Sequence, residues 1–214
     1  MRQINSKSRL AMVLSGLGGF YEPKVRQEQY LMDSEIGASV LWNACLLGDI
    51  EGKVIADLGC GTGLLGIGAL LLGAKSVLFV DFDEKALERA KNNVSKVKSE
   101  GWKLGEAKFI CRDITKLEKE KLGSIEVVLQ NPPFGTKMRH SDIFFLERAL
   151  EIAAVAYSFH KSETKGFLER FAAKKNAKIT HVWGFKFPLK ATLPFHRRQI
   201  HRINVSCLRF ELDK

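Results

Sequence analysis

The segment Asn131-Pro132-Pro133-Phe134 combines a side-chain amide, two rigid residues and an aromatic ring. The Asn131 side-chain oxygen and the Pro132 carbonyl can each accept one hydrogen of a planar amine, which localises the lone pair on the amine nitrogen. The prolines hold this geometry with little entropy to lose, and Phe134 offers a face for base stacking. As structure alone, the segment is a stiff turn that leaves a strand. As chemistry, Asn131, Pro132, Pro133 and Phe134 are the candidate catalytic residues.

A second segment with chemical potential is the glycine loop, residues 57–63, which reads D-L-G-C-G-T-G. Glycines at alternating positions let the backbone turn sharply and let a ligand contact the main chain. Asp57 would repel a pyrophosphate but attract the ammonium and, through water, the sulfonium of S-adenosylmethionine (SAM). The overlapping G-x-G-x-x-G pattern that starts at Gly61 keeps a nicotinamide or flavin enzyme open as an alternative. The candidate cofactor-binding residues of this loop are Asp57, Gly59, Cys60, Gly61, Thr62 and Gly63.

Two further carboxylates follow predicted strands. Asp81, with Phe82 beside it, stands where a cofactor ribose would lie, whereas Asp83 is expected to cap the next helix. Asp113 could accept a hydrogen bond from an adenine amino group while Ile114 packs on the ring; a surface Asp at the start of a loop is the alternative. Ligands of open α/β sheets bind outside the carboxyl ends of the strands. Asp81, Phe82, Asp113, Ile114 and Asn131 are therefore further candidate cofactor residues.

The elements that must position these residues alternate between strand and helix. Short β-branched segments at 53–58, 76–81 and 125–130 predict three buried strands. Helices are expected between them, at 64–72 after the first strand and at 83–99 after the second. We further expect helices at 6–17, 33–47, 142–151 and 163–174, and strands at 107–111, 155–159, 178–187 and 200–212. Right-handed crossovers make such a sheet mostly parallel. The pattern predicts an α/β, Rossmann-like fold with seven strands and a C-terminal antiparallel hairpin, in a single domain of residues 1–214 with an N-terminal helical extension (1–50) and a core (51–214).

Composition excludes several classes of protein. The chain has 214 residues, of which 45% are hydrophobic and 27% charged, a balance typical of globular proteins. We find no apolar run of the roughly 20 residues that a membrane span needs, and no secretory signal, so we expect a cytoplasmic protein. The four cysteines include no C-x-x-C pair, which argues against a zinc site and a disulfide framework. No bound metal is expected.

Positive charge is concentrated near the C-terminus. The net charge is +10, and the segment from His160 onward carries 13 Lys and Arg against 4 Asp and Glu. Such a field attracts nucleic acid, although a solvated surface without a partner is the alternative. The segment 195–198 mixes an aromatic ring with cations, as in loops that bind RNA. The candidate RNA-binding residues are Lys137, His160, Lys161, Phe195, His196, Arg197 and Arg198.

The tetrapeptide after the fourth strand, together with the glycine loop after the first, resembles the amino methyltransferases of the class I fold. The longer string 131–137, N-P-P-F-G-T-K, is similar to the methyltransferase-like family that makes N6-methyladenosine in small-subunit ribosomal RNA. The similarity extends through residues 19–24, 28–30, 157–161 and 195–198, and so covers nearly the whole chain.

This resemblance implies an RNA adenine-N6 methyltransferase that uses SAM. It implies SAM contacts at Gln29 and at Met32, where the family carries Thr. The resemblance also implies a partner, because eukaryotic members of the family need a small zinc-ribbon activator protein. This activator adds a strand to the methyltransferase sheet, beside its third strand. In this chain the corresponding edge is Ala107 to Ile110. Other planar amines remain open as substrates: guanine N2 in rRNA, a release-factor glutamine, or adenine in DNA. A non-catalytic RNA-binding protein is a further alternative.

Overall fold

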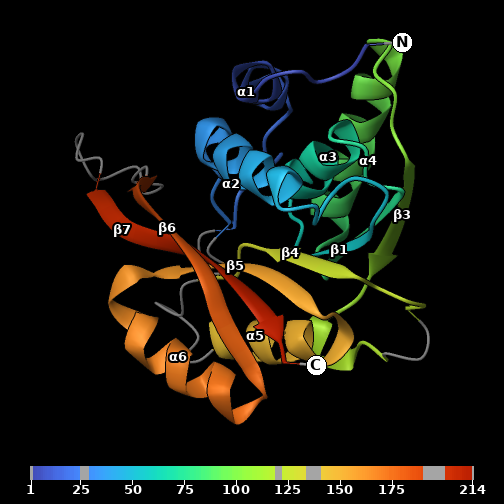
Figure 1. Ribbon diagram of the computed structural model, residues 1–214. Coiled ribbons are helices and arrows are strands. Elements are labelled where there is room, and N and C mark those ends of the chain that lie inside the picture. The colour runs from blue at the N-terminus through green and yellow to red at the C-terminus, as the bar shows by residue number, and fades with distance from the viewer. Residues whose placement is uncertain (1, 25–28, 119–121, 134–140, 190–200, 214) are drawn as a thin grey trace.

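A seven-stranded sheet with helices on both faces forms the frame of the molecule (Figure 1). The structure is a computed structural model that describes residues 2–24, 29–118, 122–133, 141–189 and 201–213. The strands, in chain order, are β1 (Val54–Leu58), β2 (Ser76–Asp81), β3 (Glu106–Cys111), β4 (Val127–Gln130), β5 (Val155–Lys161), β6 (Ala177–Leu189) and β7 (His201–Leu212). The helices are α1 (Lys7–Ser15), α2 (Ser34–Leu46), α3 (Leu64–Leu71), α4 (Glu84–Ser99), α5 (Ser141–Ile152) and α6 (Lys165–Lys174), with the short 3-10 helices η2 (Ile114–Lys116) and η4 (Ser162–Thr164).

The spatial order of the strands is β3-β2-β1-β4-β5-β7-β6. Strands β1 to β5 are parallel, and β7 runs antiparallel to both β5 and β6. The predicted α/β class, the seven strands and the C-terminal antiparallel hairpin are therefore confirmed. Because the chain returns from the edge strand β3 to place β4 beside β1, the strand order reverses between β1 and β4. A crevice at the carboxyl ends of these strands is where sheets of this kind bind ligands.

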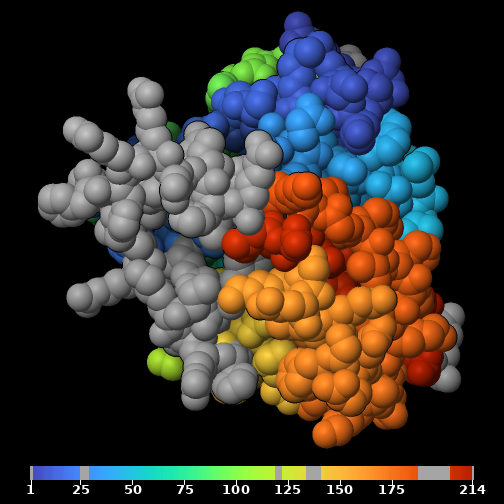
Figure 2. Space-filling model, turned by 90° about the vertical axis from the view of Figure 1, so that its left-hand side faces the viewer, coloured from blue at the N-terminus to red at the C-terminus, as the bar shows by residue number. Residues whose placement is uncertain are grey.

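Apolar side chains on the two faces of the sheet form two buried clusters. Helices α1 to α4 contribute to one cluster, and α5 and α6 to the other. Leu10 and Leu14 of α1 are 0% and 2% exposed, and burying each leucine contributes about 1.5–3 kcal/mol. The N-terminal helices therefore pack over α3 as part of the same core. Figure 2 shows them on one face of the molecule together with α6 and the C-terminal strands.

Several predicted boundaries shift for identifiable reasons. Strand β5 continues to Lys161, beyond the expected end at 159, because it pairs with β7 as far as Lys161 opposite Val205. Helix α6 begins at Lys165 because the preceding residues form η4. Asp33 caps α2 by accepting hydrogen bonds from the backbone amides of Glu35 and Ile36. Residues 190–200, which connect β6 and β7, lie outside the described part.

None of the helices in the described ranges is long and apolar enough to cross a membrane.

Candidate active site

A cavity of about 460 Å³ lies at the carboxyl ends of β1, β2 and β4. It brings together most of the residues that the sequence singled out. These are Gln29, Met32, Asp57, Gly59, Cys60, Gly61, Thr62, Asp81, Phe82, Asp113, Ile114, Asn131 and Pro133. Two predicted residues, Gly63 and Pro132, lie beside the cavity in sequence but are not part of its lining. Phe134, Lys137 and residues 195–198 lie outside the described residues.

The glycine loop turns its main chain toward the cavity. Gly59 and Gly61 have φ angles of 65° and 53°, in the left-handed region that favours glycine. A Cβ atom on Gly59 would lie 2.8 Å from the ring of Phe145, and one on Gly61 would lie 3.0 Å from Phe20. Gly63 instead is the N-cap residue of α3, where a Cβ atom would lie 3.1 Å from Ala90 of α4. The first two glycines therefore let the rings of Phe145 and Phe20 pack closely against the main chain of the loop, and the third permits close packing of the helices.

Asp57 is a buried carboxylate at the end of β1. Its Oδ2 accepts a hydrogen bond from the Gly66 amide at 2.8 Å, and the residue is 1% exposed. Burial raises the pKa of the Asp57 carboxyl to about 7, with a smaller contribution in the same direction from the charge of Asp81 and an opposing one from the Gly66 amide. A cationic group in the cavity would favour the ionised form of this carboxylate. This is the behaviour expected of a residue that attracts the ammonium of SAM.

Asp81 ties the end of β2 to the glycine loop. Its Oδ2 accepts a hydrogen bond from the Gly61 amide at 2.8 Å, and its Oδ1 accepts one from the Asp83 amide at 2.9 Å. Burial raises the pKa of this carboxyl above its ordinary value. Asp83 caps α4 through the Lys85 amide, as predicted. It also accepts a hydrogen bond from Gln29 Nε2 at 2.7 Å, which holds that predicted SAM contact at the cavity wall.

The far wall of the cavity combines one carboxylate with apolar surface. Asp113 Oδ1 accepts hydrogen bonds from the Thr115 amide and hydroxyl at 2.9 and 2.8 Å, so Asp113 caps η2 as well as lining the cavity. Ile114 is 6% exposed, whereas the Phe82 side chain is 55% exposed. The structural and the ligand-binding interpretations of Asp113 are therefore compatible. A flat heterocycle with an amino edge fits this combination of groups.

Asn131 directly follows β4 and has an unusual environment. Its side-chain Oδ1 is buried and has no hydrogen-bond partner among the described residues. Leaving such an acceptor unpaired costs about 1–3 kcal/mol. The carbonyl of Pro133 nearby accepts a hydrogen bond from the Ser141 hydroxyl at 3.3 Å, which links the turn to the first residue of α5. The unpaired oxygen on the cavity wall is a place for a donor of a bound ligand.

The prediction that His160 contacts RNA is wrong. Its side chain is 0% exposed, because β5 is an interior strand flanked by β4 and β7 and covered by α5. His160 Nε2 lies 2.7 Å from the Ser158 hydroxyl, and Nδ1 lies 3.4 Å from Asp142 Oδ2. Ser158 in turn accepts a hydrogen bond from Gln130 Nε2 at 2.8 Å. His160 therefore connects the ends of β4 and β5 to α5, while the neighbouring Lys161 is partly exposed.

Aromatic residues that the sequence reading missed complete the cavity wall. Phe20 and Tyr30 come from the N-terminal region, and Phe144 and Phe145 from the first turn of α5. Phe144 is 56% exposed, which is unusual for a large aromatic side chain on a helix. The adjacent pair at positions 144 and 145, shortly after the tetrapeptide, was the available signal in the sequence. The described residues thus offer carboxylates that can bind cationic and hydroxyl groups, a glycine loop whose main chain is accessible, and apolar walls. This combination of groups fits SAM.

Strand β3 lies at one edge of the sheet, with β2 as its neighbour. The stretch Ala107 to Ile110, where the resemblance implies an activator protein, belongs to this edge strand, and its residues are partly or fully exposed. An edge strand offers unpaired main-chain groups to another strand.

Comparison with known proteins identifies a family and relatives of nearly equal length. Residues 33–158 match the family model described as Methyltransferase small domain. The rRNA N(6)-adenosine-methyltransferase Mettl5 of Drosophila melanogaster is 34% identical, covering 95% of this chain and 95% of that protein. The protein of the same description from Danio rerio is 33% identical, covering 94% and 96%. The crystal structure of a candidate RNA methyltransferase from Pyrococcus horikoshii is 39% identical and covers 98% and 99% of the two chains with a TM-score of 0.86.

Proposed function

Because the chain belongs to the Methyltransferase small domain family, we propose that it transfers a methyl group from SAM to N6 of an adenine in ribosomal RNA, specifically that of the small subunit. The family makes the protein a methyltransferase with the Rossmann-like fold. Two relatives of nearly equal length are described as rRNA N6-adenosine methyltransferases, which supports adenine in rRNA as the substrate. The small subunit rests on resemblance only, that of residues 131–137 and of the matching segments 19–24, 28–30, 157–161 and 195–198.

The observation that carries the proposal is the buried Oδ1 of Asn131 on the wall of the cavity, which has no hydrogen-bond partner among the described residues. An adenine amine is a poor nucleophile because its lone pair is delocalised into the ring. Asn131 Oδ1 and the Pro132 carbonyl would each accept one of its two hydrogens, which localises the lone pair and aims it at the methyl group. No strong base is required beforehand, since the methylated nitrogen releases its proton readily. The protein therefore acts by positioning.

The described residues also account for the cofactor. SAM supplies a methyl group activated by a sulfonium. Asp57 would attract the ammonium of SAM, Asp81 would accept hydrogen bonds from the ribose hydroxyls, and Asp113 with Ile114 would hold the adenine ring. Gln29 and Met32 border the same cavity. The exposed ring of Phe82 adds an apolar surface beside the ribose and adenine positions.

The remaining parts of the proposal concern partners and setting. RNA binding rests on the basic C-terminal segment, which includes the partly exposed Lys161 at the end of β5. It rests also on residues 137 and 195–198, which lie outside the described residues and are proposed from the sequence alone. A small activator protein would pair with β3 near Ala107 to Ile110. We also propose that the chain acts as a single domain and in the cytoplasm.

The test is transfer of labelled methyl from SAM to purified small-subunit rRNA, followed by mapping of the labelled nucleotide. Label on N6 of one adenine supports the proposal. If the label appears on guanine N2, on DNA or on a release-factor glutamine, methyl transfer to a planar amine stands, but the proposed substrate is wrong. RNA binding without transfer, in the presence of the activator, would favour a non-catalytic RNA-binding protein.

A further inference from the structure

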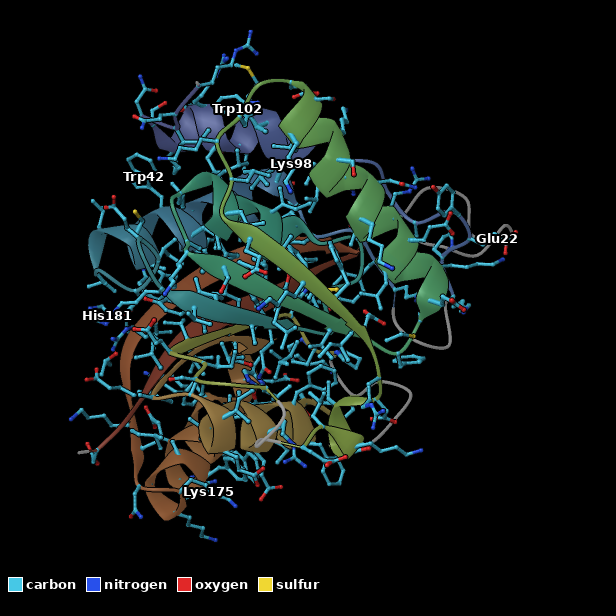
Figure 3. The ribbon with its side chains drawn as sticks, turned by 90° about the vertical axis from the view of Figure 1, so that its right-hand side faces the viewer. Glu22, Trp42, Lys98, Trp102, Lys175 and His181 are labelled. Atoms are coloured by element: carbon cyan, nitrogen blue, oxygen red, sulfur yellow. The ribbon has the colours of Figure 1, made fainter. Side chains whose placement is uncertain are left out.

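The segment that follows α1, residues 16–24, here called the N-terminal strap, lies along α4. Arg89 of α4 stacks on the ring of Tyr21, with its guanidinium carbon 3.5 Å from the ring centre. Lys85 of α4 forms an ion pair with Glu22 at 3.0 Å. Figure 3 shows Glu22 on the outer side of this helix, with Lys98 toward its other end. An ion pair as exposed as that of Lys85 and Glu22 holds a segment only weakly.

Asn93 of α4 makes a buried contact with the strap. It is 3% exposed, and its amide group is hydrogen-bonded in three directions. Oδ1 accepts a hydrogen bond from the Gly18 amide at 2.8 Å, and Nδ2 donates to the Gly18 carbonyl and to the Thr62 carbonyl, both at 2.9 Å. One side chain therefore joins the strap to the glycine loop.

The two segments that Asn93 joins form adjoining parts of the cavity wall. Phe20 follows Gly18 by two residues, and Gly61 precedes Thr62 directly. Phe20 packs so closely over Gly61 that an added Cβ atom would lie 3.0 Å from its ring. Both residues line the cavity. The hydrogen bonds of Asn93 therefore hold the chain on both sides of this contact, close to the Phe20 ring and close to the main chain of Gly61.

We propose that Asn93 is a positioning residue for the cofactor, which fixes the N-terminal strap against the glycine loop so that Phe20 closes the cavity over Gly61. Asn93 itself is not part of the cavity lining, so it acts through Gly18 and Thr62. This inference rests on the proposed function for the identity of the ligand, SAM. The joint between strap and loop does not depend on the RNA substrate.

A purely structural role makes a different prediction. The packing of α4 on the core comes from apolar residues such as Ala90 and Val94, which are 0% and 4% exposed. An amide that served only the core would affect folding alone. An amide that sets the wall of the cavity would affect cofactor affinity in protein that remains folded.

The experiment compares wild type and Asn93→Ala by titration with S-adenosylhomocysteine (SAH) and by hydrogen exchange of the strap amides. In the variant that remains folded, we expect the dissociation constant for SAH to rise about tenfold, because the loss of several buried hydrogen bonds of ordinary strength loosens the wall. We expect SAH to protect the amides of residues 20–22 from exchange in wild type and not in Asn93→Ala. The KM for RNA at saturating SAM should be unchanged.

A second variant approaches the same joint from the strap. In Gly18→Ala, the new Cβ atom would lie 2.9 Å from Arg89 Nη1 and 3.2 Å from Asn93 Oδ1. It should weaken SAH binding in the same way, and it decides the question if Asn93→Ala does not fold. The matched control is Lys96→Ala, which removes the exposed hydrogen bond from Lys96 Nζ to the Gly16 carbonyl and should leave the dissociation constant within about twofold.

The outcomes separate the two proposals. A folded Asn93→Ala or Gly18→Ala protein that binds SAH as tightly as wild type overturns the role of Asn93. A wild-type protein that binds SAH but methylates no RNA removes the proposed function and leaves the role of Asn93 standing. If wild type binds no SAH, both proposals fall.

Discussion

Asp81 and Gly61, twenty residues apart, are joined by a hydrogen bond of 2.8 Å from the Gly61 amide to the Asp81 carboxylate. The other oxygen of the same carboxylate accepts a hydrogen bond from the Asp83 amide. The glycine loop and the start of α4 are thus held by one side chain that also lines the cavity. The shape of the cofactor site depends on this residue even before a ligand is present.

We expect Asp81→Asn to lower the affinity for SAH about tenfold and the free energy of unfolding by about 1 kcal/mol, because an amide cannot accept both backbone hydrogen bonds. Calorimetric titration and urea unfolding measure the two effects. The matched control is Asp33→Asn, in which asparagine still caps α2 and both quantities should stay near wild type. Equal effects of the two substitutions would contradict the role given to Asp81.

Asn131→Ala should separate activity from stability. We expect kcat to fall by about two to three orders of magnitude, by analogy with the loss of one preorganised hydrogen-bonding group at a reaction centre. Because Asn131 Oδ1 has no partner among the described residues, its removal breaks no hydrogen bond seen there, and the free energy of unfolding should stay the same or rise.

Single-turnover methyl transfer and urea unfolding check this prediction. A matched control is Asn43→Ala, which removes the hydrogen bond from Asn43 Nδ2 to the Ser39 carbonyl on α2 and should leave kcat intact. A variant Asn131→Ala with unchanged kcat would show that Asn131 does not hold the amine.

The raised pKa of Asp57 predicts opposite pH dependences for stability and for cofactor binding. The folded protein keeps the Asp57 proton up to about pH 7, whereas the unfolded chain releases it near the ordinary value of 3.8. This stabilisation is therefore complete below about pH 4 and is lost as the pH rises to about 7. The ionised carboxylate attracts the ammonium of SAH, so its affinity should increase over the upper part of the same range.

The measurement is the difference between wild type and Asp57→Asn in urea unfolding and SAH titration at pH 5 and pH 8. An asparagine at this position can still accept the hydrogen bond from the Gly66 amide, but its side chain does not titrate. The stability of wild type relative to the variant should fall between pH 5 and pH 8, and its relative affinity for SAH should rise. Parallel pH profiles of the two proteins would show that Asp57 does not titrate in this window.

His160 and Lys161 are neighbours with different expected effects. His160→Ala should lower the free energy of unfolding by about 2 kcal/mol, since it removes a buried ring and leaves Ser158 and Asp142 without this partner. Lys161→Ala should change stability by less than about 0.5 kcal/mol and reduce the salt dependence of RNA binding by about one unit of slope. Thermal unfolding and RNA titration at several salt concentrations distinguish the two effects. Loss of RNA affinity in a fully stable His160→Ala protein would restore the original prediction.

Much of the fold was predictable because local patterns and core packing agree. The helix predicted at 83–99 is α4, and its residues Ala86, Ala90 and Val94, spaced four apart, are at most 4% exposed. The strand-end carboxylates were found because parallel strands bring their carboxyl ends together. Most of the predicted cofactor residues therefore meet in one cavity.

What the sequence did not show depends on contacts between distant segments. Phe20 reaches the cavity because the strap is held along α4 by Asn93, and no local pattern around residue 20 indicates this. His160 was placed at a surface because β5 was expected to end at 159. Its pairing with β7, which arrives more than forty residues later, extends the strand and buries the side chain.

The pairing of β1 with β4 has a further consequence. Leu58 lies opposite Gln130 in the parallel ladder, so the glycine loop and Asn131 leave the sheet at the same level, from adjacent strands. The distance between the methyl donor and the acceptor nitrogen would then be fixed by the backbone hydrogen bonds between β1 and β4, whose lengths vary little. Residues beyond these strands can diverge and select a different RNA while that separation stays constant. In such a frame, the choice of substrate and the chemistry performed on it can evolve independently.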